Sequence, residues 1–201
     1  MVKMAVDIVL LPSEQMTNKA IEANSRLLTQ FADQITLDKE KCLPHISLAM
    51  GCIDKKHIEC IGKIIQTIAL KYPPGQLSVI GIDTATNSVG EKVSAFELEK
   101  TQRLQSLHEE VMRRTTPYFS YDVTAKMVLS PPIAGKSTLL WIKNYPEKSA
   151  FENFFPHITI GYGQTDDFSF PAKFTASKLA LCHLGNHCTC RKILAAIELK
   201  L

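Results

Sequence analysis

The amino-acid sequence predicts a fold that mixes helices with strands and carries a weak internal repeat. Three observations lead to this prediction. Strand-like and helix-like patterns alternate through the first half of the chain, and the second half begins in the same order. A short histidine motif occurs once in each half, and two strand-like segments around Gly185-Asn186 close the chain as a hairpin.

The first half has the more regular pattern. Residues 2–11 are apolar apart from Lys3 and Asp7, which favours a buried strand. The segment 13–32 begins with a serine that can cap a helix, and its apolar residues recur at helical spacing. A strand over 43–50 carries the first histidine motif. A second helix then opens at 53–54 and stops at the proline pair before Gly75.

The second half contains an insertion. Its expected elements are strands over 76–83 and 93–98 joined by a polar turn at 87–90, a helix over 101–116, a strand over 139–145, a short helix over 146–154, a second motif strand from 156, and a hairpin of 174–184 with 189–199. Compared with the first half, roughly two dozen extra residues precede the second motif, within 126–150. Such an excess usually forms a loop or lid near a site, and its role here is left open.

The two histidine motifs share one pattern. Pro44-His45-Ile46-Ser47-Leu48 and Pro156-His157-Ile158-Thr159-Ile160 each read proline, histidine, apolar, hydroxyl, apolar. Because strand side chains alternate between faces, His45 and Ser47 point the same way, as do His157 and Thr159. A pentad of this kind arises by chance roughly once in tens of thousands of positions, so coincidence explains the pair poorly.

The chemistry of these residues suits a phosphate under substitution. A neutral imidazole accepts a proton near pH 7 and an imidazolium donates one, so two histidines supply a base and an acid. The hydroxyls of Ser47 and Thr159 can donate hydrogen bonds to a phosphoryl oxygen between them. No metal ion is then required. A histidine on a strand is usually structural, and only the duplicated context singles out His45 and His157.

Two His-x-Ser/Thr-x motifs about half a chain apart resemble the signature of the 2H phosphoesterase superfamily, which includes the 2′–5′ RNA ligase-like and cyclic phosphodiesterase branches. The resemblance covers nearly the whole chain in layout, but its specificity lies in the two motifs. It implies an α+β fold of two pseudo-twofold-related lobes, each an antiparallel sheet backed by helices, with a central active-site cleft. The chain is then one intertwined 2H domain over 1–201, with approximate halves 1–90 and 91–201.

The resemblance also implies an activity. It implies a metal-independent phosphodiesterase acting on 2′,3′-cyclic phosphates or 2′–5′ linked nucleotides, with His45 and His157 as catalytic residues and no cofactor. Ser47 and Thr159 would hold the phosphoryl oxygens, although threonine is frequent where Ser47 stands. Tyr162 could flank a base or ribose, but its alternation phase is opposite to that of His157. Lys136 is a candidate cation over the cleft, or simply a solvated lysine.

Composition limits the partners. The 201 residues are 45% apolar and 21% charged, which allows a sizeable core, and no segment approaches the length of a membrane span. A net charge of +3 does not favour long double-stranded nucleic acid, so the expected partner is a nucleotide or short RNA. We expect a soluble monomer in the cytoplasm, or alternatively the nucleus. The six cysteines, without an export signal, are expected to be reduced thiols.

Three alternatives compete with this interpretation. Gly135-Lys136-Ser137-Thr138 has the end of a P-loop, but Ser130 stands where the first glycine is required and two prolines remove phosphate-binding amides. His183, Cys188 and Cys190, or Cys182 with the same two cysteines, could begin a zinc site in an interaction protein, yet a structural site normally needs four ligands. Finally, the chain could be an RNA-end or nucleotide-binding module with the 2H cleft but little turnover.

Overall fold

Strand β6 (Ala172–Leu184) joins the two parts of the sheet in the computed structural model, which describes residues 2–28, 35–86, 90–165 and 172–199. Its first residues pair with β3 (Gln76–Thr86). Its remaining residues pair with β1 (Lys3–Pro12) on one side and β7 (Cys190–Glu198) on the other. A single long strand therefore connects the elements of both halves of the sequence.

The two motif strands lie at opposite ends of the sheet. The strand order is β2-β1-β6-β3-β4-β5, where β2 is Ile46–Asp54, β4 is Lys92–Leu98 and β5 is His157–Tyr162, and all pairings are antiparallel. Strongly buried apolar residues from both halves form one main core. The predicted α+β fold with antiparallel strands backed by helices is confirmed.

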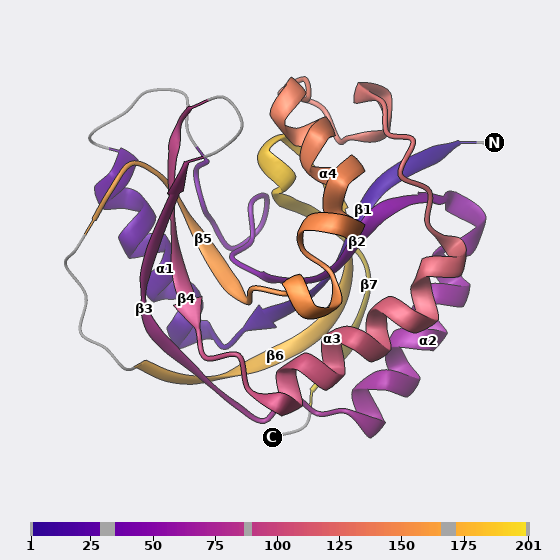
Figure 1. Ribbon diagram of the computed structural model, residues 1–201, viewed down its shortest axis with the longest axis horizontal. Helices are drawn as coiled ribbons and strands as arrows, with labels where there is room; N and C mark the ends of the chain where they lie inside the picture. The colour runs from indigo at the N-terminus through magenta and orange to yellow at the C-terminus, as the bar shows by residue number, and fades with distance from the viewer. Residues whose placement is uncertain (1, 29–34, 87–89, 166–171, 200–201) are drawn as a thin grey trace.

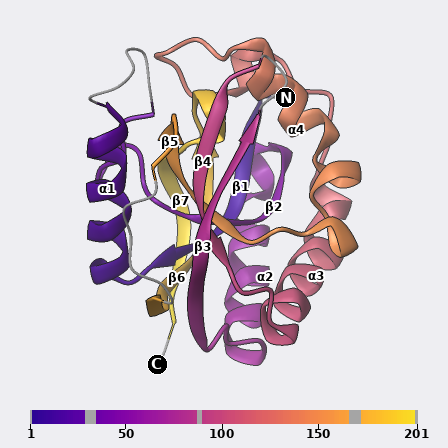
Figure 2. The same ribbon diagram turned by 60° about the vertical axis from the view of Figure 1, so that its left-hand side comes forward.

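Three helices cover the sheet on two sides of the molecule. Helix α1 (Glu14–Leu28) packs along β5, whereas α2 (Ile58–Lys71) packs on β7 and α3 (Gln102–Thr115) on β2 (Figures 1 and 2). Each presents an apolar stripe, which in α2 consists of Ile61, Ile65 and Ile68. Thr101 caps α3 by accepting a hydrogen bond from the amide of Leu104 at 3.2 Å.

The insertion contains a helix rather than the predicted strand. Residues Lys136–Lys148 form α4, so the expectation of a strand over 139–145 and a short helix over 146–154 is wrong. The buried side chains of α4 are Thr138, Ile142 and Tyr145, at separations of four and three residues. The continuous apolar run 139–142 obscured this helical spacing, because a short apolar run fits a buried strand equally well.

Other boundaries differ by a few residues. The first motif strand begins at Ile46, one residue after His45, and extends to Asp54, where the second helix was expected to open. Asp54 instead caps a short 3-10 turn over Lys55–His57 that precedes α2. The end of the first predicted helix beyond Leu28 and residues 87–89 of the predicted turn lie outside the described residues.

The closing hairpin contains a disulfide bond. Cys182 of β6 and Cys190 of β7 are bonded to each other and fully buried, so the expectation of six reduced thiols is wrong for this pair. The bond removes two of the suggested zinc ligands, and His183 Nε2 lies 3.0 Å from the Met127 carbonyl. Within the described ranges, no group of three or more metal-ligating side chains comes together, and no helix is long and apolar enough to cross a membrane.

Candidate active site

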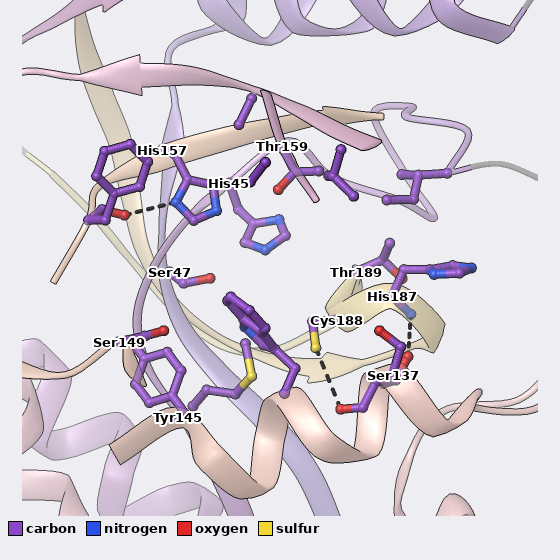
Figure 3. A pocket seen from close by; sticks show the side chains of 18 of the residues that line it. His45, Ser47, Ser137, Tyr145, Ser149, His157, Thr159, His187, Cys188 and Thr189 are labelled. Carbon is purple, nitrogen blue, oxygen red and sulfur yellow. Dashed lines mark hydrogen bonds between the residues drawn. The ribbon is translucent and has the colours of Figure 1, made fainter. Parts of the chain in front are cut away.

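A cavity of about 310 Å³ lies between the two motif strands (Figure 3). Residues of β3, β4, α4 and the β6–β7 connection also line it, as do Ile35 and Leu37. Four of its lining residues come from the first motif region and four from the second, at the same offsets from their histidines. They are Leu43, His45, Ser47 and Met50, and Phe155, His157, Thr159 and Tyr162. The two motifs therefore contribute equivalent positions, at −2, 0, +2 and +5, to one cavity.

Both histidines are held by the same local contact. Nδ1 of His45 lies 2.8 Å from the carbonyl oxygen of Leu43, and Nδ1 of His157 lies 2.8 Å from that of Phe155. A carbonyl oxygen only accepts, so each Nδ1 carries the hydrogen and donates it. In the neutral ring, Nε2 is then the unprotonated nitrogen. In each histidine, Nδ1 holds the ring in place and Nε2 can accept a proton.

The environment keeps both imidazoles neutral in the unliganded protein. The pKa of His45 is lowered to about 4, chiefly by burial and also by the nearby His157, against the raising effect of the Leu43 carbonyl. Burial also lowers the pKa of His157, but the Phe155 carbonyl and the charge of Asp83 raise it. Asp83 itself lines the cavity. The two rings are therefore placed in unequal electrostatic surroundings.

A β-bulge follows the hydroxyl residue in each motif. In β5, Ala95 pairs with Thr159 and Ser94 with Gly161, which leaves Ile160 as the extra residue. Gly161 has φ 135°, a conformation that favours glycine. The extra residue reverses the alternation, so Tyr162 lines the cavity although strict alternation placed it on the opposite face from His157.

The first motif contains the equivalent irregularity. Val9 pairs with Ser47 and Ile8 with Ala49, so Leu48 is the extra residue of β2. Met50 consequently reaches the cavity, as Tyr162 does from β5. The sequence does not predict these two bulges, because a bulge is defined by how two strands pair and not by the motif itself.

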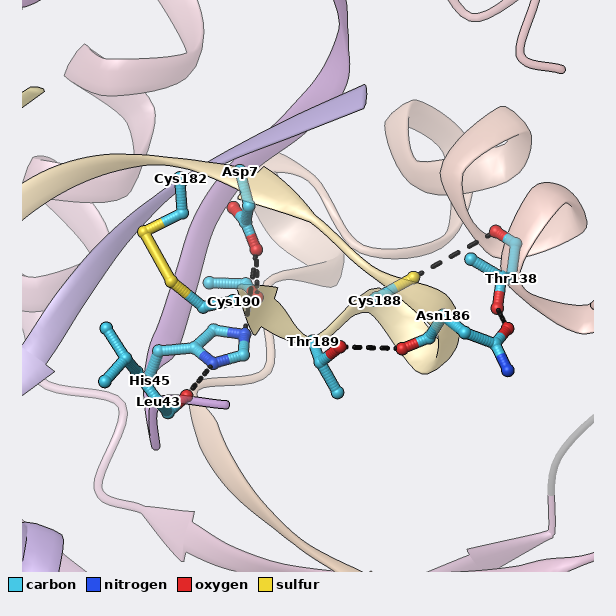
Figure 4. Close-up of polar contacts among 10 residues, drawn as sticks. Asp7, Leu43, His45, Thr138, Cys182, Asn186, Cys188, Thr189 and Cys190 are labelled. Atoms are coloured by element: carbon cyan, nitrogen blue, oxygen red, sulfur yellow. Dashed lines mark hydrogen bonds and ion pairs between the residues drawn. A yellow bond between two sulfur atoms is a disulfide. The ribbon is translucent and has the colours of Figure 1, made fainter. Parts of the chain in front are cut away.

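The side chain of Asp7 lies beside the first motif, although Asp7 is far from His45 along the sequence. Asp54 and Asp166, the first acidic residues after each motif, are each nine positions from a motif histidine, but β1–β2 pairing brings Asp7 against the first motif. Its Oδ2 accepts a hydrogen bond from Ser47 Oγ at 2.6 Å. The same oxygen lies 4.0 Å from His45 Nε2 (Figure 4). The fold therefore places beside the first motif a carboxyl group that distance along the sequence does not indicate; Asp166 lies outside the described residues.

The remaining wall supplies polar groups that the sequence did not single out. Tyr162 Oη lies 2.5 Å from Nδ1 of His187, and both residues line the cavity. Lys136, the predicted cation, is exposed at the start of α4 and does not line the cavity. Lys148, at the other end of α4, does. The sequence did not indicate that Lys148 lines the cavity, because this segment was expected to form a strand and a short helix.

The structure is an α+β fold in which two histidine motifs line one cavity. Comparison with solved structures finds proteins with a similar fold. The chain is similar over its whole length to TT0787 of Thermus thermophilus, with a TM-score of 0.59, 14% identity and 98% coverage of both chains. It is also similar to Escherichia coli LigT complexed with phosphate, with a TM-score of 0.50, 11% identity and 100% coverage of both chains. The resemblance is thus confirmed for the fold. No family model and no curated protein matches the sequence.

Proposed function

We propose that this chain is a 2H phosphoesterase that hydrolyses a cyclic or 2′–5′ phosphodiester of a nucleotide or short RNA without a metal ion. The observation that carries the proposal is the matched pair of histidines, each with Nδ1 bound to the carbonyl two residues earlier and each lining the same cavity. Such a pair supplies general base and general acid catalysis around one phosphate. LigT, which has this fold, was crystallised with phosphate.

The unequal surroundings of the histidines favour distinct roles. A base must be neutral before the reaction, which suits His45 with its pKa of about 4. The acid must be protonated, and a bound phosphate anion would raise the pKa of His157, which burial lowers in the free protein while the Phe155 carbonyl and the charge of Asp83 oppose that effect. His45 then takes a proton from a water molecule as the oxygen of that water bonds to phosphorus. His157 gives a proton to the ribose oxygen as its bond to phosphorus breaks, which leaves a phosphomonoester.

The size and charge of the cavity favour a small substrate. At about 310 Å³, the cavity is at the lower end of the range for small-molecule sites. Among the described residues that line it, Lys148 is the one lysine or arginine, so the site lacks the row of cations that tracks a long phosphate backbone. Trp141 and Phe155 line the cavity with side chains 50% and 45% exposed, which suits stacking on a single nucleobase.

A substrate panel tests this proposal. Nucleoside 2′,3′-cyclic monophosphates, 1″,2″-cyclic phosphate derivatives and 2′–5′ linked dinucleotides are incubated with the protein in the presence of a chelator. We expect hydrolysis of at least one class, undiminished by the chelator. Product formation that requires an added divalent ion would contradict the metal-independent mechanism. Saturable binding without turnover would favour the alternative, a nucleotide-binding module.

A further inference from the structure

Asp7 is the most deeply buried charged side chain beside the candidate site. It lies in β1, where it pairs with Met50 of β2 and with Cys182 of β6, and its exposed fraction is 0%. Among the residues that the structure describes, none forms a hydrogen bond with its Oδ1. Over the described ranges, the one basic nitrogen found within 4.0 Å of the carboxyl belongs to His45. A carboxylate in this position would be a poorly compensated buried charge.

The proton of this pair resides on Asp7 near neutral pH. Burial raises the pKa of Asp7 to about 8, against the lowering effects of the Ser47 hydroxyl and the Ala49 amide. The same burial lowers the pKa of His45 to about 4, so His45 does not hold the proton. The 4.0 Å separation is also too long for a hydrogen bond that would stabilise an ion pair.

The protonation state of Asp7 decides where the Ser47 hydroxyl points. When Asp7 is ionised, the single hydrogen of Ser47 is donated to Oδ2 over 2.6 Å and cannot be donated to a substrate. When Oδ2 carries a proton, the same contact runs in the opposite direction, and Asp7 donates to Ser47 Oγ. The hydroxyl of Ser47 is then free to donate into the cavity that it lines.

We propose that Asp7 is a positioning residue that acts as a neutral carboxylic acid and directs the Ser47 hydroxyl toward a phosphoryl oxygen of the substrate. This inference rests on the proposed function for the identity of the acceptor, but not for the hydrogen bond itself. No covalent bond changes at Asp7, and its proton stays on the protein through the reaction. Ionisation of Asp7 therefore switches Ser47 from a donor for substrate to a donor for Asp7.

The other groups that face Asp7 titrate outside the relevant range. They are His45 before β2, Cys188 in the β6–β7 connection and Tyr145 of α4. Burial and the charge of Asp7 raise the pKa of Cys188 and that of Tyr145 well above their ordinary values. His45 titrates far below neutrality, and its neighbour His157 below its ordinary value of 6.5. A step near pH 8 in this cluster therefore reports Asp7.

The kinetic test compares Asp7→Asn with the wild-type protein, because an asparagine amide donates to Ser47 at every pH. The dependence of kcat/KM on pH is measured for the active cyclic nucleotide, also in Ser47→Ala and in the double variant. With a pKa of about 8, the wild-type rate should fall about thirtyfold relative to Asp7→Asn between pH 6.5 and 9.5. In the Ser47→Ala background, Asp7→Asn should not change the profile. Equal profiles for Asp7→Asn and wild type would overturn the proposal.

A second measurement does not depend on turnover. The infrared difference spectrum of wild type minus Asp7→Asn should show the carbonyl band of a protonated carboxylic acid at pH 7, and this band should disappear above pH 9. A carboxylate signal at pH 7 would overturn the proposal even if the enzyme is active. A carboxylic acid band without turnover of any substrate would instead count against the proposed function alone. Circular dichroism of each variant confirms that the comparison is made between folded proteins.

Discussion

Met50 and Tyr162 occupy equivalent places in the two motif strands: each lies five residues after its histidine, and each lines the cavity. In both strands a bulge after the hydroxyl residue reverses the alternation of side chains. The duplication seen in the sequence therefore extends beyond the pentads, to an irregularity of the backbone that sets which side chains surround the phosphate site that we propose.

The bulge in β5 depends on Gly161, so we expect Gly161→Ala to damage both stability and turnover. At φ 135° a side chain is strained, with a cost of about 1–3 kcal/mol in the free energy of unfolding. Straightening the strand would also turn Tyr162 away from the cavity. Urea denaturation and the rate of hydrolysis measure the two effects.

Gly62→Ala is the matched control for this variant. Gly62 lies in α2, and an added Cβ would meet Ala195 at 3.5 Å, which is ordinary van der Waals contact. Alanine is preferred to glycine within a helix by about 0.5–1 kcal/mol, so this variant should be more stable at unchanged turnover. Equal behaviour of the two variants would show that the bulge has no special role.

The hydroxyls of the two motifs should contribute to the rate. We expect Ser47→Ala and Thr159→Val each to lower kcat by a factor of about 10² to 10³, since each removes one hydrogen bond to the developing charge. Steady-state kinetics on the active substrate measures the loss, with thermal denaturation as the check on folding. Rates within threefold of wild type would mean that the hydroxyls are only strand residues.

The roles of the two histidines can be separated with the leaving group. A nucleoside p-nitrophenyl phosphodiester releases an anion that needs no proton, so it removes the demand for the acid but not for the base. We therefore expect this substrate to restore most of the lost rate in His157→Ala and little in His45→Ala. The opposite pattern would reverse the assignment of base and acid.

Much of the fold and the centre of the site could be predicted from the sequence, because an apolar run indicates β1, helical patterns indicate α2 and α3, and the turn at Gly185-Asn186 indicates the closing hairpin. The motif pair likewise identified His45 and His157 as the candidate centre of one site. Asp7 and His187 could not be found in this way, since strand pairing and the β6–β7 connection bring them in from distant positions. Helix α4 was missed because its apolar run has no clear period.

Stability should depend on pH through Asp7. Its pKa is about 8 in the folded protein against an ordinary value of 3.8, so the folded state binds an extra proton between these values. The corresponding stability is complete below pH 3.8 and is lost as the pH rises through 8. From pH 6 to 9.5 the wild-type protein should lose about 3 kcal/mol more than Asp7→Asn.

Urea denaturation at several pH values measures this difference. Asp122→Asn serves as a control for removing a carboxylate, because Asp122 is exposed. It should follow the wild-type dependence. If Asp7→Asn also does so, Asp7 is ionised in the folded protein near neutral pH, contrary to our account.

The most direct test of the paired-histidine mechanism is kcat/KM for His45→Ala, His157→Ala and the double variant on a nucleoside 2′,3′-cyclic monophosphate, measured in chelator. We predict that each single substitution lowers the rate by a factor of about 10² to 10⁴. The double substitution should cost scarcely more than the more damaging single one, because the residues act as a unit. Near-normal turnover in either single variant would contradict the mechanism.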